Sequence, residues 1–340
     1  MLFGSPISWV LTELFAVIVF FACMYHATKQ SKPFIRILEL FGFVVGAALF
    51  ENVGVFEAHT YYYDVRRVLM VGGVPLEILF LEAAIWYAAF NLALRLVRKL
   101  WAVPFVVGLF GSIQDMTVDP SAVFDRYALS ADVAAKVEGL YPGAFGEGGL
   151  SGQWNWSNPG YDGGFFDIPW YNFSGWMYLM VWFTAWVLVG RWLHSKFENN
   201  VVGFTYPILA GVLNVVTIAT PLTRFLLFGW GSIETGEGSA APQLTLLCFN
   251  YALAIMLLAV FWRSRTKIDL RRNGWVIFGV PIALHVFDIV YAFAMGTTVA
   301  YVPALVVGAI HVAFLALVLV KNKSAAEPTY SAIDPAPATA

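Results

Sequence analysis

Long apolar stretches separated by short polar connections make up most of the chain. A transmembrane helix needs about 20 consecutive, mostly apolar residues. We expect such helices near residues 7–27, 35–56, 74–94, 101–115, 172–192, 201–222, 243–262, 275–294 and 299–320. The fourth stretch is short, so the chain has eight spans instead of nine if this stretch is re-entrant. The pattern predicts an all-α fold, a polytopic transmembrane helix bundle in which residues 1–323 form a single membrane-embedded domain.

The basic residues of the connections gather on one side of the predicted bundle. With the N-terminus outside, the inner side receives fifteen of the 20 basic residues: Lys29, Lys32, Arg36, Arg95, Arg98, Lys99, Arg191, Lys196, Arg263, Arg265, Lys267, Arg271, Arg272, Lys321 and Lys323. The outer side keeps Arg66, Arg67, Arg126, Lys136 and Arg224. Basic residues favour the cytoplasmic side of a membrane, so the pattern predicts an N-out, C-in topology with an odd number of spans.

The composition agrees with this interpretation. Hydrophobic residues make up 59% of the chain and charged residues only 12%, against about 25% in an average soluble domain. The mean hydropathy is +0.71. A water-soluble fold of this size cannot bury so much apolar surface, whereas a bilayer solvates it. We therefore expect a multi-pass protein of the cytoplasmic (plasma) membrane. The net charge of −2 gives no indication of a nucleic-acid partner, and the oligomeric state is left open.

One long connection lies on the predicted outer side. Residues 116–171 are rich in Gly, acidic and aromatic residues. Ordered loops of this length are commonly functional, so we expect an outer loop or lid here. An interfacial belt of aromatic residues is the alternative. Residues 324–340 are rich in Ala, Pro, Ser and Thr, and we expect them to form a disordered C-terminal tail.

Several ionisable side chains fall at membrane depth, where they must face the protein interior. Glu51 with Asn52, and likewise Glu82, lie about two turns inside the outer ends of the second and third spans. His285 and Asp288 are three residues apart and share a helix face. We expect these groups to converge in the outer half of the bundle. The alternative for Glu51 or Glu82 is a protonated carboxyl that joins two helices by a hydrogen bond.

Other polar residues have simpler explanations. Glu77 lies in the first turn of the third span, where the helix dipole stabilises a carboxylate. His26, His194 and His311 are interpreted as single solvated or packed residues. Arg224 is interpreted as a counter-ion at the outer face or as a side chain that extends to the lipid headgroups.

Asp115 and Asp119 are spaced to share one face of a helix. Such a pair can hold Mg²⁺ beside a diphosphate, as in membrane prenyltransferases, although no second acidic segment with matching basic residues accompanies it. Pro120 is expected to end the helix here, which makes Asp119 a turn residue in the alternative interpretation. The chain has no HxxxH, HExxH or GxxxxGK[ST] motif and no GxGxxG before a helix, so no metal or nucleotide cofactor is predicted.

Two groups of short motifs stand out in the first half of the chain. The first comprises Glu51-Asn52-Val53-Gly54, Tyr61-Tyr62-Tyr63, Gly73-Val74-Pro75-Leu76 and Trp86-Tyr87. The second comprises Asp115, Asp119-Pro120, Trp154-Asn155-Trp156, Gly160-Tyr161, Ile168-Pro169 and Asn172-Phe173-Ser174-Gly175-Trp176. In this order they resemble the carotenoid biosynthesis membrane protein family, which includes carotenoid 1,2-hydratases of the bisanhydrobacterioruberin hydratase type. The resemblance covers roughly residues 40 to 190.

The resemblance implies an enzyme that hydrates a terminal isoprenoid double bond of an acyclic carotenoid, with no metal and no cofactor. An acid must protonate the alkene, a base must then deliver water to the tertiary cation, and aromatic faces stabilise that cation. The carboxyls suited to catalysis are Glu51, Glu82 and Asp115. The residues expected to bind the substrate are Asn52, Tyr63, Trp86, Asp119, Trp156, Asn172 and Trp176. Asn52 and Asn172 orient water in this interpretation, or cap helix ends in the alternative one.

Two other classes of function remain open. A carotenoid or polyprenyl cyclase, or a prenyltransferase, shares the cation chemistry, but only the prenyltransferase requires a diphosphate donor and Mg²⁺. A non-enzymatic isoprenoid lipid-binding or carrier protein would tolerate neutral substitutions at Glu51, Glu82 and Asp115.

Overall fold

The computed structural model describes residues 1–141, 149–156, 164–166, 168–229, 240–262 and 268–322. Within these ranges, nine helical segments are long and apolar enough to cross a membrane. They contain α1 (Ile7–Ala27), α2 (Pro33–Phe56), α3 (Leu76–Leu96), α4 (Val103–Phe124), α6 (Trp170–Phe197), α7 (Asn200–Ile218), α9 (Ala240–Val260), α11 (Gly279–Met295) and α12 (Thr298–Lys321). The predicted all-α polytopic bundle is confirmed, and the chain is a multi-pass membrane protein.

Two of the spans begin with a shorter helical element. The 3₁₀ turn η1 (Leu100–Ala102) precedes α4, while η2 (Leu270–Gly274) and α10 (Trp275–Ile277) precede α11. The predicted tail at 324–340 lies outside the described residues, as do Gly160-Tyr161 of the sequence motifs. The N-out orientation stays a prediction.

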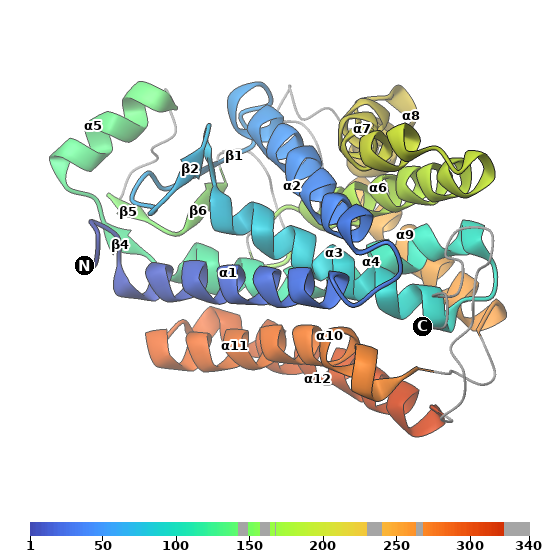
Figure 1. Ribbon diagram of the computed structural model, residues 1–340. Helices are drawn as coiled ribbons and strands as arrows, with labels where there is room; N and C mark the ends of the chain where they lie inside the picture. The colour runs from blue at the N-terminus through green and yellow to red at the C-terminus, as the bar shows by residue number, and fades with distance from the viewer. Residues whose placement is uncertain (142–148, 157–163, 167, 230–239, 263–267, 323–340) are drawn as a thin grey trace.

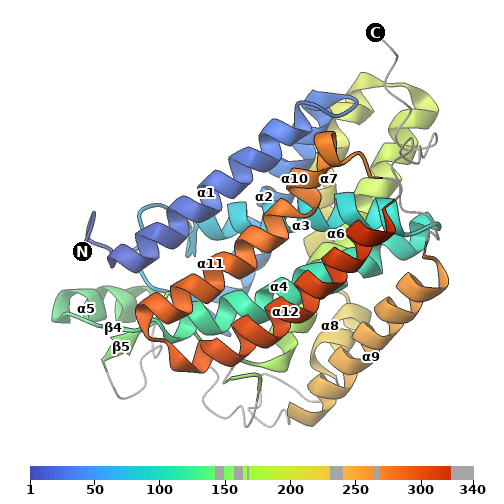
Figure 2. The same cartoon turned by 90° about the horizontal axis from the view of Figure 1, so that it is seen from below.

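The helices α3 and α4 lie at the centre of the bundle (Figure 1). Of their most apolar stretches, 89% and 78% are buried inside the protein, against 33% in α9 and in α12. α1 and α2 pack on α3, whereas α6, α9, α11 and α12 pack on α4, as Figure 2 shows from below. Polar residues on α3 and α4 are therefore shielded from lipid on all sides, and these helices can carry buried carboxyls.

Close packing of α2 against α7 depends on small residues. A Cβ at Gly42 would lie 2.2 Å from the carbonyl oxygen of Pro207, and a Cβ at Gly211 would lie 2.3 Å from that of Gly42. Without a hydrophobic driving force inside lipid, membrane helices associate largely through such close backbone contact. This contact fixes the position of α7 beside α2, where the two helices form one side of the cavity described below.

The fourth span is longer than the sequence predicts. It runs over Leu100–Phe124, so residues 116–124 belong to a membrane helix and not to an outer loop, and the prediction that Pro120 ends the helix is wrong. A proline costs the helix one backbone hydrogen bond. Membrane helices tolerate this loss where neighbouring helices surround the proline, and Pro120 is buried in the bundle.

Short strands and the small helix α5 cover one end of the bundle (Figure 1). β1 (Tyr61–Tyr63) pairs antiparallel with β6 (Trp154–Trp156), β2 (Met70–Val71) with β3 (Val74–Pro75), and β4 (Tyr127–Ala128) with β5 (Leu150–Ser151). The helix α5 (Ala131–Leu140) follows β4, and α8 (Pro221–Phe228) follows α7. The β1–β6 pair brings the two groups of sequence motifs together.

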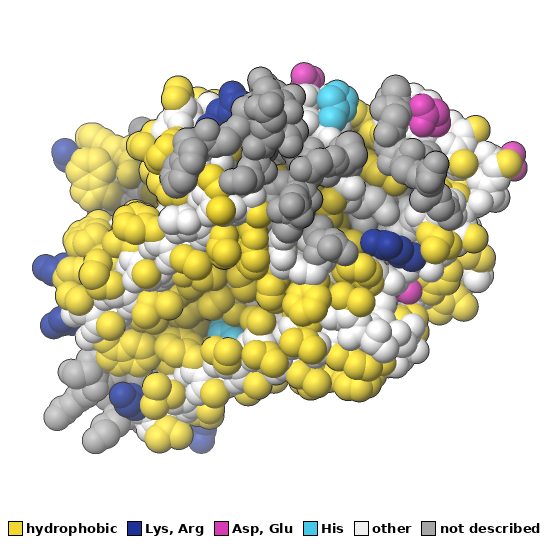
Figure 3. All heavy atoms as spheres, turned by 180° about the vertical axis from the view of Figure 1, so that it is seen from behind, with side chains coloured by type: hydrophobic (Ala, Val, Ile, Leu, Met, Phe, Trp, Pro, Cys, Tyr) yellow, Lys and Arg dark blue, Asp and Glu magenta, His cyan; other side chains and the backbone are white. Residues whose placement is uncertain are grey.

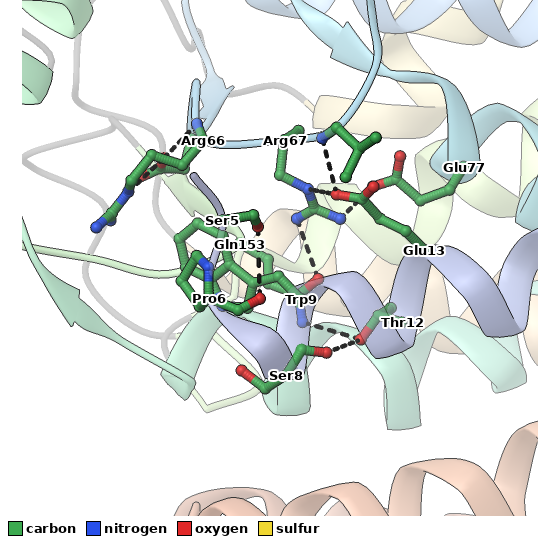
Figure 4. A network of polar contacts seen from close by, with 12 residues as sticks. Ser5, Pro6, Ser8, Trp9, Thr12, Glu13, Arg66, Arg67, Glu77 and Gln153 are labelled. Carbon is green, nitrogen blue, oxygen red and sulfur yellow. Dashed lines mark hydrogen bonds and ion pairs between the residues drawn. The ribbon is translucent and has the colours of Figure 1, made fainter. Parts of the chain in front are cut away.

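A buried arginine attaches this end to the membrane helices (Figure 4). Arg67 follows β1 and lies between two carboxylates, with its Nε donating to Glu13 of α1 at 3.0 Å and its Nη2 to Glu77 of α3. Its Nη1 donates to Gln153 at 3.1 Å, next to β6. Glu77 is thus bound by a guanidinium in addition to its place in the first turn of α3. The cluster joins α1, α3 and both strands that carry the aromatic motifs.

The outer surface is apolar where lipid would contact it. Figure 3 shows one face covered mostly by hydrophobic side chains, with Lys and Arg gathered along its left edge. At the basic end, Glu39 of α2 accepts hydrogen bonds from Arg191 of α6 at 2.7 and 2.6 Å and from Arg36 at 2.7 Å. Tyr206 of α7 donates to it as well. This buried ion cluster joins three helices at the end opposite the strands.

Candidate active site

A cavity of about 380 Å³ lies beneath the β1–β6 pair. Its lining comes from α2, α3, α4, α6, α7 and α8 together with both strands. Small-molecule sites typically have volumes of about 300–1,000 Å³. Most of the wall is apolar or aromatic, including Phe50, Leu81, Trp176 and Ile218, while Glu57 and Arg224 lie at the exposed rim. The cavity can therefore enclose part of an apolar molecule near one end of the bundle.

Glu51 faces this cavity and is held by two tyrosines. The Tyr61 hydroxyl donates to its Oε2 at 2.6 Å and the Tyr63 hydroxyl at 2.7 Å. Both rings come from β1, where residues two apart point to the same face of a strand. Burial, with the Glu51 charge nearby, raises the pKa of Tyr61 and of Tyr63 well above the usual range. Both phenols therefore stay protonated and remain donors at neutral pH.

Glu82 of α3 lies behind Glu51, outside the cavity wall, and the two side chains share a hydrogen bond. An ionised carboxylate can only accept, so a hydrogen bond between two carboxyl groups requires a proton on one of them. The other oxygen of Glu82, Oε2, is buried and has no hydrogen-bond partner among the described residues. The pair therefore keeps a carboxyl proton at the wall of an apolar cavity.

A second carboxyl pair lies on α4. The Asn172 amide nitrogen of α6 donates to Oδ2 of Asp115 at 2.7 Å and to Oδ2 of Asp119 at 2.5 Å. Asp119 faces the cavity and also accepts a hydrogen bond from Trp154, whereas Asp115 lies behind the wall. Since Asn172 lies inside α6, after its N-cap Pro169, its side chain does not cap the helix but links the two aspartates.

The two pairs form one cluster. Asp115 lies close enough to Glu82 and Glu51, as well as to Asp119, for the four carboxyl groups to influence one another electrostatically. Asp115 Oδ1 is buried without a hydrogen-bond partner among the described residues, and so is the indole nitrogen of Trp156, which lines the cavity. Each pair thus has one member at the cavity and one behind it. The unmatched polar atoms leave positions where a water molecule or a ligand oxygen can bind.

Aromatic rings surround the cavity-facing carboxyls. The Trp156 ring centroid lies 5.0 Å from that of Tyr61 and 5.9 Å from that of Tyr171. The Tyr63 centroid lies 5.8 Å from that of Trp154. The faces of such rings attract a positive charge, so this wall can stabilise a carbocation that forms beside Glu51.

The structure brings together most of the residues predicted to act in catalysis or binding. Six of them line the cavity: Glu51, Tyr63, Asp119, Trp156, Asn172 and Trp176. Glu82 and Asp115 lie directly behind Glu51 and Asp119. The arrangement gives Glu51 and Asp119, and not Glu82 or Asp115, direct access to a bound molecule.

Two predicted site residues lie elsewhere. The Asn52 amide donates to the carbonyls of Ala48 and Val71 at 2.7 and 3.1 Å, and its oxygen accepts from the Gly73 nitrogen at 2.8 Å, so Asn52 holds the β2–β3 turn. Trp86 is fully buried and donates to Thr184 at 3.0 Å between α3 and α6. Consecutive side chains on a helix point about 100° apart, so Asn52 does not face the cavity that Glu51 lines.

The sequence interpretation missed Tyr61, Trp154 and Gly175. Tyr61 and Trp154 are each two residues away from a predicted residue, Tyr63 and Trp156, and the period of two typical of strands would have identified both. Gly175 carries no functional group, and its place in the cavity wall follows only from the packing of α6.

The polar residues of α11 form a separate cluster. Thr117 of α4 donates to Asp288 at 2.7 Å, and His285 lies 2.9 Å from His311 of α12, measured between Nε2 and Nδ1. None of these residues lines the described cavity. The expected convergence of Asp288 with Glu51 and Glu82 is therefore wrong. His311 and His26 each have a side-chain hydrogen-bond partner as well. The partner of His311 is His285, and the His26 ring lies 2.9 Å from the Tyr87 hydroxyl oxygen.

Among the described residues, no group of three or more His, Cys, Asp or Glu side chains is arranged to hold a metal ion. Comparison with protein-family models, with curated proteins and with solved structures found no match for this chain. The class of the protein is therefore defined by its fold and its cavity: a multi-pass helical membrane protein with a carboxyl-lined, largely apolar site at one end of the bundle.

Proposed function

We propose that this protein is a carotenoid hydratase of the cytoplasmic membrane, which adds water to a terminal isoprenoid double bond of an acyclic carotenoid. The observation that carries the proposal is the buried Glu51–Glu82 carboxyl pair, of which Glu51 lines a largely apolar cavity. A site for a polar substrate does not require such an apolar, aromatic wall, whereas a site for a hydrocarbon substrate does. The motif resemblance of residues 40 to 190 supports the same reaction.

In the proposed reaction, the proton that the Glu51–Glu82 pair shares is the acid proton, and Glu51, which faces the cavity, delivers it. This proton moves to the CH carbon of the terminal double bond, a C–H bond forms, and the neighbouring carbon becomes a tertiary cation. Tyr61 and Tyr63 stabilise the Glu51 carboxylate that remains, because both donate to the same oxygen. The faces of Trp156 and Tyr61 stabilise the cation.

Asp119 is the proposed base. Water bonds through its oxygen to the cation, and Asp119 accepts the proton that this water releases. Asn172 orients the Asp119 carboxylate by its short hydrogen bond. The net change is the addition of one water molecule, and the proton returns from Asp119 to Glu51. Asp115 and Glu82 are positioning residues in this scheme, since they lie behind the cavity wall and each interacts with the cavity-facing carboxyl of its own pair.

Pigment analysis tests the proposal directly. The chain is expressed in a host that accumulates acyclic carotenoids, and the extract is analysed by liquid chromatography with mass spectrometry. A more polar product heavier by one water supports hydration. An isomer of unchanged mass indicates a cyclase, and a product heavier by a prenyl group that depends on Mg²⁺ indicates a prenyltransferase. An unchanged pigment bound to the purified protein indicates a carrier.

The variants Glu51→Gln and Asp119→Asn identify the acid and the base. Removing a general acid or base typically lowers a rate by about 10²–10⁴-fold, so each variant should lose most of its product at normal protein level. Asp288→Asn is the matched control, because Asp288 is an equally buried carboxyl that lies outside the cavity. Full activity of Glu51→Gln would remove Glu51 from the acid role.

A further inference from the structure

A buried glycine forms part of the cavity wall next to Asn172. Gly175 lies three residues further along α6, so the two share one face of the helix, separated by about 4.5 Å along its axis. A Cβ at Gly175 would have a single described neighbour within 4 Å, the Cζ atom of Phe50 at 3.8 Å. The space beside Gly175 is therefore cavity and not packed protein.

Several other buried glycines in the spans have a packing reason. A Cβ at Gly108 would lie 2.7 Å from the Met177 carbonyl oxygen, and a Cβ at Gly190 would lie 2.2 Å from the Tyr206 ring. Such distances exclude any side chain. At Gly175 the contact of 3.8 Å is ordinary van der Waals contact, yet glycine destabilises a helix relative to alanine. The packing of the described residues does not explain glycine at this position.

We infer that Gly175 sets the size of the group that the cavity accepts, and that this group is the slender, methyl-branched end of an acyclic isoprenoid chain. The identity of the chain rests on the proposed function. A side chain at position 175 lies against Phe50 and extends into the cavity. The four carbons of a leucine side chain at this position would therefore occupy space that the ligand otherwise fills.

Phe50 provides a test of this geometry. It is the only described residue that would contact a Cβ at position 175, and it lines the cavity beside Glu51. Truncating Phe50 in the Gly175→Leu background removes the ring that the leucine would contact. The leucine side chain can then occupy the volume of that ring instead of the volume that the ligand needs. A double-mutant cycle then measures whether the two positions limit the same volume.

The experiment measures binding separately from turnover. The purified full-length protein in detergent is titrated with lycopene, and binding is followed by quenching of tryptophan fluorescence, since Trp154, Trp156 and Trp176 line the cavity. The variants are Gly175→Ala, Gly175→Leu and Gly175→Leu with Phe50→Ala. Gly279→Leu is the control, because a Cβ at this position of α11 meets nothing within 4 Å and lies outside the cavity.

We expect Gly175→Ala to bind nearly as well as the unmodified protein. Gly175→Leu should weaken binding on the order of tenfold or more, as overfilled sites typically do, and the Phe50→Ala change should restore part of the loss. Equal lycopene affinity of a folded Gly175→Leu protein overturns the inference, and so does the absence of lycopene binding by the unmodified protein. Normal binding with this variant pattern but without a hydrated product contradicts only the hydratase proposal.

Discussion

Gly54 leaves the space that the Tyr61 side chain occupies: a Cβ at Gly54 would lie 2.7 Å from the Tyr61 hydroxyl oxygen. The same hydroxyl donates to Glu51 at 2.6 Å. A glycine one turn along α2 from Glu51 therefore allows a strand residue to hold the proposed acid. The motif that contains Glu51 and Gly54 and the motif that contains Tyr61 are separate in the sequence, and neither indicates this contact alone.

Gly54→Ala should displace Tyr61 from Glu51. The end of the tyrosine side chain can move by the few tenths of an ångström needed, so the fold is expected to persist. The loss of one hydrogen bond to a charged group, about 1.5–3 kcal/mol, predicts a rate of hydration about 10–100-fold lower. Product formation at equal protein level measures it.

Tyr61→Phe should reproduce the effect of Gly54→Ala, and combining both changes should add little, because each removes the same hydrogen bond. Gly279→Ala is a control without neighbours at the new methyl group. Additive losses in the double variant would show that Gly54 acts through something other than Tyr61.

Asn172 is expected to be needed for both activity and stability. Its amide is the donor that Asp115 and Asp119 share, and Asn172→Leu leaves two neighbouring carboxyls without it. Polar contacts between membrane helices contribute on the order of 0.5–2 kcal/mol each, so the free energy of unfolding should fall by about 1–3 kcal/mol. Thermal unfolding in detergent measures the change.

Asn172→Gln separates the two effects. It keeps the amide but moves it by one methylene, so it should recover stability more than activity. Asn199→Leu serves as a comparison at an exposed helix N-terminus, where the side chain only caps α7. An Asn172→Leu protein that is as stable and as active as the unmodified one would contradict the role of the shared amide.

Hydropathy predicted the spans because lipid imposes one requirement on all of them, an apolar outer surface. It failed at the end of α4, where Asp115, Asp119 and Pro120 make a buried segment look like a loop. Asp115 and Asp119 face Asn172 of α6, and Pro120 is buried, so lipid places no constraint on them. Depth along a span can be predicted from the sequence, and it identified Glu51 and Glu82. Asp115 was identified by its spacing with Asp119 and by the motif resemblance.

The direction in which a side chain points was harder to predict from the sequence. Asn52 is adjacent to Glu51 but binds the β2–β3 turn, and Trp86 is one turn from Glu82 but fills the core. Asp288 has the right depth but belongs to a helix packed on another side of α4. Which faces meet depends on helix rotation, and this is set by contacts such as Gly42 with Pro207 that no local pattern reveals.

The orientation of the bundle predicts opposite results for two reporter fusions. With the N-terminus outside, a fusion after Lys321 lies in the cytoplasm, and one after Gly296, between α11 and α12, lies outside. A fluorescent protein that matures only in the cytoplasm should report the first fusion, and a phosphatase active only outside should report the second. The reverse pattern would place the cavity near the cytoplasmic surface.

Arg67 should contribute strongly to the stability of the strand-covered end of the bundle. It is buried between Glu13 and Glu77 and also contacts Gln153 (Figure 4). Removing one partner of a buried ion cluster leaves the others unpaired and costs about 3–5 kcal/mol. Arg67→Met, which keeps much of the length without the charge, should therefore unfold at clearly lower temperature in detergent.

The reason for that loss can be tested by neutralising the carboxylates. If the unpaired charges are responsible, adding Glu13→Gln and Glu77→Gln to Arg67→Met should restore much of the unfolding temperature. Arg67→Lys should be intermediate, since lysine keeps the charge but lacks the fork that reaches both carboxylates. A triple variant no more stable than Arg67→Met would instead assign the loss to the contact with Gln153, through which Arg67 positions the strand that carries Trp154 and Trp156.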